Sequence, residues 1–153
     1  MPRLENFKVY TNKLDVGDVI TNDTIILNDK TWYERFFVGI YDVYNNPPED
    51  RSREFVGQYI LNYQSINRDQ FIINDIYIST ITFFFTDGAI TTNFFPYKWV
   101  LGELIVMTIN SGTGKYLGAK GYVNFDIIEI VEDRLYACGN SQWTANFSFF
   151  FTN

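Results

Sequence analysis

The feature that most constrains the fold is a regular alternation of side chains at the end of the chain. Apolar residues occupy every second position from Trp143 to Phe151, and Thr, Asn and Ser fill most positions between them. Successive side chains of an extended chain point to opposite sides. The face formed by Trp143, Ala145, Phe147, Phe149 and Phe151 is therefore predicted to lie in a core, and the face with Thr144, Asn146, Ser148 and Thr152 to meet water.

The same period of two recurs along the rest of the chain, and no stretch keeps a helical spacing long enough to outweigh it. The composition agrees, because 19% of the residues are aromatic and alanine, the strongest helix former, is scarce. Asp87-Gly88 is typical of a tight hairpin turn. Besides the last strand, we predict strands over residues 18–27, 36–44, 55–63, 76–86, 89–95, 103–109 and 121–131.

Eight antiparallel strands suffice to close a barrel whose interior holds side chains or one small ligand. The length of 153 residues fits a single domain. We therefore predict an all-β fold, an eight-stranded antiparallel closed barrel over residues 17–153, preceded by an N-terminal extension or strand over residues 1–16. A β-sandwich is the alternative, since a strand count alone does not distinguish one closed sheet from two packed sheets.

The residue types that are absent limit the chemistry. Histidine does not occur and Cys138 is the single cysteine, which excludes Ser-His-Asp and Cys-His nucleophile systems, His-based zinc sites and an intrachain disulfide. A net charge of −6 disfavours a nucleic-acid partner. No apolar run is long enough to span a membrane, and residues 1–6 contain no signal-peptide core. We predict no metal, no cofactor, and an intracellular, cytoplasmic or virion location.

Some predicted strands are apolar on both faces, which a barrel with a wet exterior does not require. Apolar side chains of this kind, assigned to an association surface, are Leu104, Val106, Ile76, Ile78 and Phe84. Large exposed apolar patches usually mark contacts with other proteins. We therefore predict a homo-oligomer or a place in a larger assembly.

Residues 110–121 form a glycine-rich link between two predicted strands. A phosphate-binding Walker loop would need glycine at position 109 and Ser or Thr at position 116, which hold Ile109 and Tyr116. The link instead resembles the turn motif of dirigent proteins and allene oxide cyclases, and weaker similarities occur at residues 17–22, 38–41 and 82–88. Its motif residues are Gly112, Thr113, Gly114, Tyr116, Gly118 and Gly121.

The resemblance implies a β-barrel fold, with Tyr116 as a buried aromatic of the turn, and usually a dimer or trimer. From the cyclases it implies that Asn22 and Asn12 hold a water molecule. From the dirigent proteins it implies that Asp23 acts as an acid. Asp42 is a further candidate, because an inward carboxylate in the middle of a strand would have a raised pKa.

Two departures from the cyclase pattern weigh against catalysis. The position of its pocket glutamate falls at or near Thr11, and that of its pocket cysteine falls at Tyr41, which is far bulkier. The sequence therefore favours a non-catalytic barrel that acts through protein association, as a structural subunit of a virus particle or another large assembly. The alternative is a barrel that binds a fatty-acid epoxide or a phenolic ligand and guides its cyclisation or coupling, as a cofactor-free isomerase or cyclase.

Overall fold

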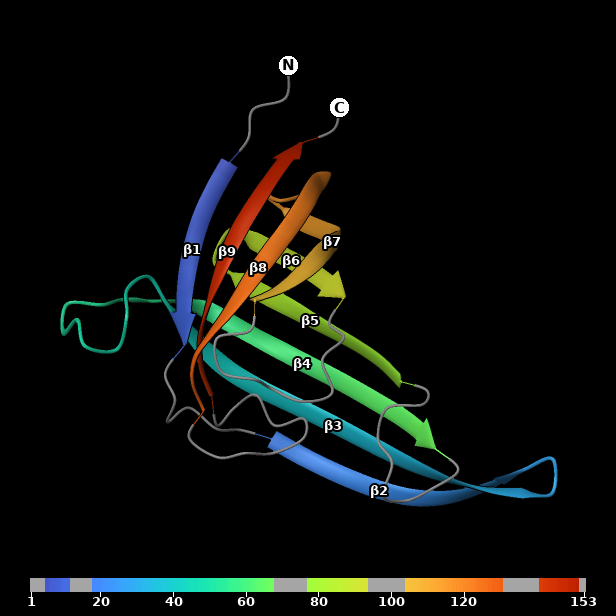
Figure 1. Ribbon diagram of the computed structural model, residues 1–153. Helices are drawn as coiled ribbons and strands as arrows, with labels where there is room; N and C mark the ends of the chain where they lie inside the picture. Colours follow the sequence, from blue (N-terminus) through green and yellow to red (C-terminus); the bar gives the residue numbers. More distant parts are fainter. Residues whose placement is uncertain (1–4, 12–17, 68–76, 94–103, 131–140, 152–153) are drawn as a thin grey trace.

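Antiparallel strands make up nearly all of the described structure. The computed structural model describes residues 5–11, 18–67, 77–93, 104–130 and 141–151. Within these ranges the strands are β1 (Glu5–Thr11), β2 (Asp18–Leu27), β3 (Lys30–Tyr44), β4 (Phe55–Asn67), β5 (Tyr77–Phe85), β6 (Gly88–Asn93), β7 (Leu104–Gly114), β8 (Ala119–Ile130) and β9 (Ser141–Phe151). They form one sheet in the order β1-β9-β8-β7-β6-β5-β4-β3-β2 (Figure 1).

A second pairing of β1 closes this sheet into a barrel. β1 pairs along its length with β9, and its last residues also pair with the end of β3, Tyr10 with Tyr44 and Thr11 with Val43. The eight-stranded closed antiparallel barrel is therefore confirmed, and the alternative of a sandwich is wrong. The strand that completes the ring is β1, whereas the segment predicted over residues 18–27 pairs with the first part of β3 beside the ring.

β3 is longer than predicted because a hairpin turn precedes it. Asn28 and Asp29 have φ values of 53° and 60°, and they connect the paired residues Leu27 and Lys30. A two-residue turn of this kind needs positive φ at both central positions, which Asn and Asp tolerate best after glycine. The hairpin of β2 and β3 consequently projects beyond the barrel (Figure 1).

The glycine-rich link is shorter than predicted, because the strands around it extend into it. β7 continues to Gly114 and β8 begins at Ala119, which leaves a four-residue turn. A bulge at Asn110 keeps β7 paired with β6, since Thr92 faces Ile109 while Thr91 faces Ser111. Gly114 has a φ of 58°, a conformation that costs other residues about 1–3 kcal/mol.

Aromatic rings fill the centre of the barrel. Phe147 stacks on Phe7 with centroids 4.5 Å apart and meets Phe83 edge to face at 4.9 Å. Tyr41 is buried and stacks on Tyr59 at 4.7 Å. Other large side chains that are fully buried include Phe125, Phe149, Leu61, Ile81 and Ile90. The alternation in the last strand is thereby confirmed from Ala145 to Phe149, since Ala145, Phe147 and Phe149 are buried while Asn146 and Ser148 are partly exposed. The prediction that Thr144 meets water is wrong, because Thr144 is buried where it pairs with Tyr10 on one side and Asp126 on the other.

Candidate functional site

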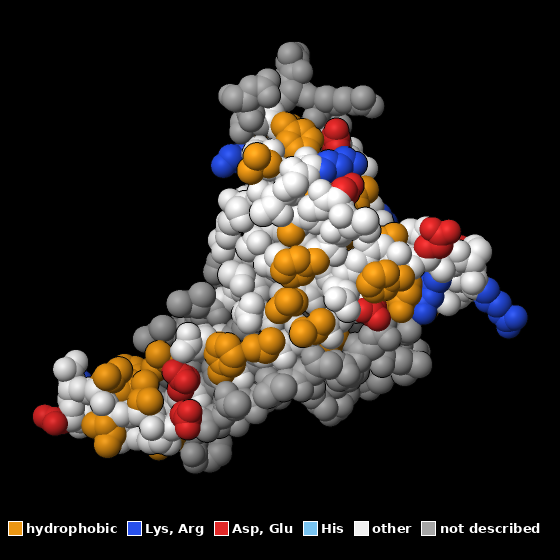
Figure 2. Space-filling view, turned by 180° about the vertical axis from the view of Figure 1, so that it is seen from behind, with side chains coloured by type: hydrophobic (Ala, Val, Ile, Leu, Met, Phe, Trp, Pro, Cys, Tyr) orange, Lys and Arg blue, Asp and Glu red, His pale blue; other side chains and the backbone are white. Residues whose placement is uncertain are grey.

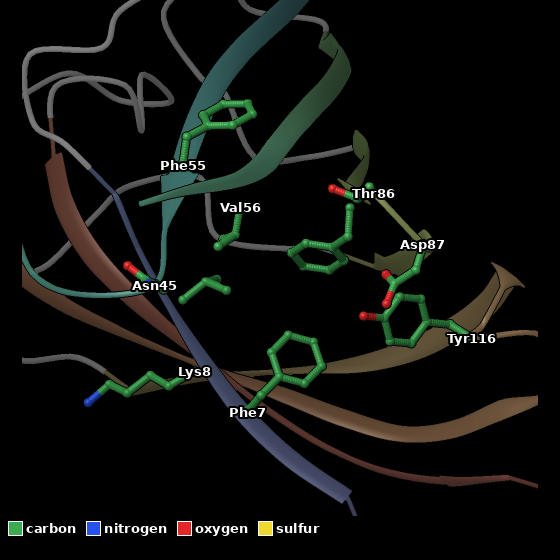
Figure 3. Close-up of a pocket in the computed structure, with 10 residues that line it drawn as sticks. Phe7, Lys8, Asn45, Phe55, Val56, Thr86, Asp87 and Tyr116 are labelled. Atoms are coloured by element: carbon green, nitrogen blue, oxygen red, sulfur yellow. The ribbon is translucent and has the colours of Figure 1, made fainter. Parts of the chain in front are cut away.

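A pocket of about 530 Å³ lies at one mouth of the barrel (Figure 3). It forms where the middle of β1, the start of β4, the β5–β6 turn and the β7–β8 turn come together. The residues that matter for its chemistry are Phe7, Phe55, Val56, Phe85, Asp87 and Tyr116. The pocket is thus built from segments that lie far apart in the sequence.

The inner wall of the pocket is aromatic and continuous with the core. Phe7 and Phe85 meet edge to face with centroids 5.5 Å apart, and Tyr116 lies 5.7 Å from Phe85. Phe7 and Phe85 also contact the buried ring of Phe147. Rings that pack against a filled core have little freedom to move, so the wall is preorganised for a flat apolar surface.

The opposite wall depends on a β-bulge at the start of β4. Tyr44 pairs with Phe55 while Val43 pairs with Gly57, so Val56 is the extra residue. A bulge changes the direction of the side chains around it, and both Phe55 and Val56 line the pocket here. The preceding loop is fixed by hydrogen bonds from the Asn45 amide to the Glu54 carbonyl at 3.1 Å and from the Glu54 amide to Asn45 Oδ1 at 2.8 Å.

The polar end of the pocket consists of Tyr116 and Asp87. The Tyr116 hydroxyl donates a hydrogen bond to the Asp87 carboxylate, and their oxygen atoms lie together in Figure 3. Burial, followed by the charge of Asp87 and this hydrogen bond, raises the pKa of Tyr116 to about 12. The hydroxyl therefore stays protonated at neutral pH, and its oxygen and the carboxylate oxygens remain available as acceptors.

Asp87 also joins two turns. Its carbonyl accepts a hydrogen bond from the Lys115 amide at 2.9 Å, and its Oδ2 atom lies 3.6 Å from Lys115 Nζ. The neighbouring Thr113 Oγ1 accepts a hydrogen bond from the Ala89 amide at 3.1 Å. The glycine motif thus fixes the β7–β8 turn against the β5–β6 turn, and this contact places Tyr116 at the pocket.

The predicted catalytic candidates within the described residues, Asn22, Asp23 and Asp42, are not among the residues that line this pocket. Asp23 is exposed on β2, opposite Glu34 and beside the ring. Asn22 is its neighbour on β2 and pairs with Arg35, and Asn12 lies outside the described residues. Asp42 is on the outer face of β3, where its Oδ1 accepts a hydrogen bond from Gln58 Nε2 at 3.0 Å.

The outward position of Asp42 follows from the alternation of the strand, because its neighbours Tyr41 and Val43 are both buried in the barrel. The inward carboxylate considered from the sequence is therefore not present at this position. Tyr41 does point inward and occupies the interior, as its bulk suggested. Roles for Asn12, Asn22 and Asp23 stay predictions.

The predicted association surface stays a prediction, and three of its five residues have described side chains. Leu104 and Val106 are 60% and 61% exposed on β7, and Phe84 is 45% exposed on β5. Ala89 pairs with Phe84 on one side and with Thr113 on the other. Leu104 lies nine residues before Thr113, which is about 30 Å along β7 from the position opposite Phe84. Ile78 belongs to β5, and Ile76 lies outside the described residues.

Two classes of site find no support among the described residues. In these ranges, no three or more Cys, Asp or Glu side chains gather in a way that could hold a metal ion. A search of the same residues for a helix with the length and hydropathy of a membrane span gives none.

Comparison with known proteins supports the fold. No protein-family model and no curated protein matches the chain. A pterocarpan synthase dirigent protein matches with a TM-score of 0.62 and 14% identity over 99% of this chain and 90% of that chain. A second pterocarpan synthase dirigent protein matches with a TM-score of 0.50 and 15% identity over 100% and 97%. A pyocyanin demethylase has a TM-score of 0.50 and 12% identity over 92% and 98%.

These similarities concern the backbone arrangement. At 12–15% identity they establish a shared fold and do not identify the function of the pocket. The dirigent-like barrel inferred from the glycine motif is therefore confirmed as a fold.

Proposed function

We propose that the chain is a ligand-binding barrel that holds a small, flat, hydrophobic molecule in the pocket at its mouth. The observation that carries this proposal is the shape of that pocket, which has an aromatic wall and one polar end. Its volume of about 530 Å³ lies within the range of small-molecule sites, roughly 300–1,000 Å³.

The polar end gives the ligand an orientation. Because the Tyr116 hydroxyl donates a hydrogen bond to Asp87, the pair offers acceptors to the pocket. A ligand with an O–H or N–H group at one end and a flat apolar body would satisfy both parts of the site. Lys8 also lines the pocket, and its ammonium group extends away from the other lining side chains (Figure 3).

The proposed reaction, if the ligand is transformed, is a cyclisation or coupling guided by the shape of the site. Tyr116, with its raised pKa, is a weak acid, so proton donation from its hydroxyl would contribute little to the rate of such a reaction at neutral pH. A rigid aromatic wall can instead fix one conformation of a reactive molecule, which lowers the entropic part of the barrier. The names of the structurally similar proteins, two pterocarpan synthase dirigent proteins and a pyocyanin demethylase, also refer to small organic molecules.

Filling the pocket tests this proposal. The substitution Val56→Trp is expected to weaken the binding of 2-naphthol, used as a flat probe with one hydroxyl, by at least about ten-fold, equivalent to ~1.4 kcal/mol. Isothermal titration calorimetry measures the change. Val106→Trp is the matched control, because Val106 is exposed on the outer face and lies outside the pocket. Equal affinities of the two variants, or no binding to the unmodified protein, would contradict the proposal.

A second candidate function is association through the outer face, favoured by an apolar strip on β3, β4 and β5. Phe36, Ile40 and Phe84 are exposed there, and the partly buried Ile60 pairs directly with Ile40. Apolar side chains run across the middle of one face of the molecule (Figure 2). The proposed partner is a second copy of this chain, and a larger particle such as a virion would be built from that contact.

The charge of the protein supports a second copy at this strip. Two molecules with a net charge of −6 repel one another, so they approach most easily through an uncharged face. The direct cross-strand neighbours in the middle of the strip are uncharged, since Thr82 lies opposite Ile60 and Asn62 lies opposite Val38. The one carboxylate in the row of Phe84 among these paired residues is that of Asp42, which accepts a hydrogen bond from Gln58 at the edge of the strip. An apolar patch that matches itself across a two-fold axis gives a closed dimer.

Sedimentation velocity tests the association. The unmodified protein is expected to sediment as a dimer, and the double variant Ile40→Lys/Phe84→Lys as a monomer, because each lysine places a charge in the contact. Ile26→Lys is the control, since Ile26 is exposed at the end of the projecting hairpin. A monomeric unmodified protein at micromolar concentration would refute this second function.

A further inference from the structure

A second hollow lies on the outer surface of the barrel, across β1, β9 and β8. Its volume is about 350 Å³, and its polar lining residues are Asn6, Lys8, Asn124, Asn146 and Ser148. These side chains point outward, because their neighbours Phe147 and Val123 are buried in the core. The hollow therefore opens on the outer face of the barrel. It shares Phe7 and Lys8 with the lining of the mouth pocket but differs from that pocket in having a mainly polar lining.

The strand register arranges these residues in two adjacent rows. In one row Lys8 pairs with Asn146, and Asn146 pairs with Asn124. In the next row Asn6 pairs with Ser148, and Ser148 pairs with Tyr122. Neighbouring strands are about 4.8 Å apart, so the three strands span about 10 Å, roughly the length of two linked sugar rings.

The carboxamides in this hollow have unused hydrogen-bonding capacity. Ser148 Oγ donates to Asn6 Oδ1 at 2.8 Å, which leaves the Asn6 amide group free to donate outward. In the described part of the chain, no hydrogen bond between side chains engages Asn124 or Asn146. Each carboxamide offers a donor and an acceptor side by side, the pattern that two adjacent hydroxyl groups of a sugar can match.

Aromatic residues border the rows. Tyr122 is 46% exposed beside Ser148 and presents a ring at the surface. Tyr10 follows Lys8 on the same face of β1, and Lys8 Nζ lies 5.3 Å from the centre of its ring. An exposed aromatic face can pack against the C–H groups of a sugar ring, while the carboxamides bind the hydroxyl groups around it.

We propose that this hollow, made by the carboxamides of Asn6, Asn124 and Asn146 beside Tyr122, binds a neutral carbohydrate chain. Its chemistry argues against other ligands. The net charge of −6 disfavours polyanions, and among the described residues Lys8 is the one cation in the lining. An apolar ligand would leave the carboxamides without partners, which costs about 1–3 kcal/mol for each buried group.

Binding of neutral oligosaccharides tests the proposal. The probes are cellohexaose, maltoheptaose and chitohexaose, titrated into the full-length protein at millimolar concentrations and followed by calorimetry. At least one is expected to bind saturably. The double variant Asn124→Ala/Asn146→Ala is expected to weaken that binding at least about ten-fold, since each lost hydrogen bond contributes about 1 kcal/mol. Tyr122→Ala is expected to weaken it as well.

Asn110→Ala is the matched control. Asn110 also lies on the outer surface, but its amide group donates to Asn93 Oδ1 at 2.7 Å and it is not part of the hollow. Sugar binding by this variant should equal that of the unmodified protein. The proposal is overturned if none of the three probes binds, or if binding survives unchanged in the double variant while its thermal unfolding is normal. Binding of 2-naphthol at the mouth pocket should be unaffected throughout, so the two proposals can fail separately.

Discussion

Replacing Phe83 by alanine is expected to lower the free energy of unfolding by about 3–5 kcal/mol, the cost of a large cavity in a packed core. Phe83 is fully buried on β5, and its ring contacts Phe147 at 4.9 Å, Tyr59 at 5.8 Å and Phe125 at 6.0 Å. Phe147, Tyr59 and Phe125 belong to three different strands, so the cavity would weaken contacts between strands on several sides of the barrel. Urea unfolding followed by fluorescence measures the change.

Phe84→Ala is the matched control, because the next residue of the same strand has the same side chain on the opposite face, where it is 45% exposed. Its expected cost is below about 1 kcal/mol. The comparison is made at the lowest protein concentration that the signal allows, so that association through the outer face contributes least. Equal losses for Phe83→Ala and Phe84→Ala would mean that β5 does not present its faces as described.

The strands were predictable because apolar and polar residues alternate along a strand that has one buried and one exposed face. In the last strand, Ala145, Phe147 and Phe149 are buried, and the polar residues between them are on the other face. Tyr116 is buried at the turn, as the glycine motif indicated. These features depend on residues close together in the sequence, and local patterns carry that information.

The closure of the barrel was not predictable in the same way. β1 meets the end of β3 through the pairing of Tyr10 with Tyr44, two residues separated by the whole β2–β3 hairpin. Periodicity shows that a segment is a strand but does not specify its partner. The turn at Asn28-Asp29 was also missed, because it lacks the glycine that usually marks a two-residue hairpin.

The candidate site shows the same limit. Asp87 was interpreted as a turn residue and Tyr116 as a buried aromatic of the motif, and both descriptions hold. Their joint role at the polar end of a pocket arises only when the β5–β6 and β7–β8 turns meet. No local signal connects them with Phe7 at the start of the chain. Predicting a site that is built from distant segments requires the strand topology as well as the sequence.

The filled interior also limits where a ligand can bind. Dirigent-like function requires a space, and the rings of Tyr41, Tyr59 and Phe83 occupy the centre of this barrel. In this chain the accessible apolar volume is at the mouth, next to Tyr116 and Phe85. The proposed binding of a ligand at the mouth would therefore leave the packed core intact.

Replacing Gly121 by alanine is expected to lower the free energy of unfolding by about 3 kcal/mol or more, through two effects at one position. Gly121 has a φ of 151°, which residues with a side chain rarely adopt. This conformation costs such residues about 1–3 kcal/mol. A Cβ atom there would also collide with the Ser148 carbonyl and lie 2.7 Å from Phe149 Cα. Both atoms belong to the backbone of β9, so a shift that relieves the collision would disturb the pairing of β8 with β9.

Urea unfolding of Gly121→Ala, compared with Lys120→Ala, measures this effect. Lys120 is the exposed neighbour of Gly121 on β8, and its replacement is expected to change stability by less than about 0.5 kcal/mol. Because Gly121 pairs with Phe149, whose ring contacts Tyr116 at 5.9 Å, the loss should also reduce 2-naphthol binding at the mouth pocket. A Gly121→Ala variant with unchanged stability would show that β8 and β9 do not approach each other as closely as this register requires.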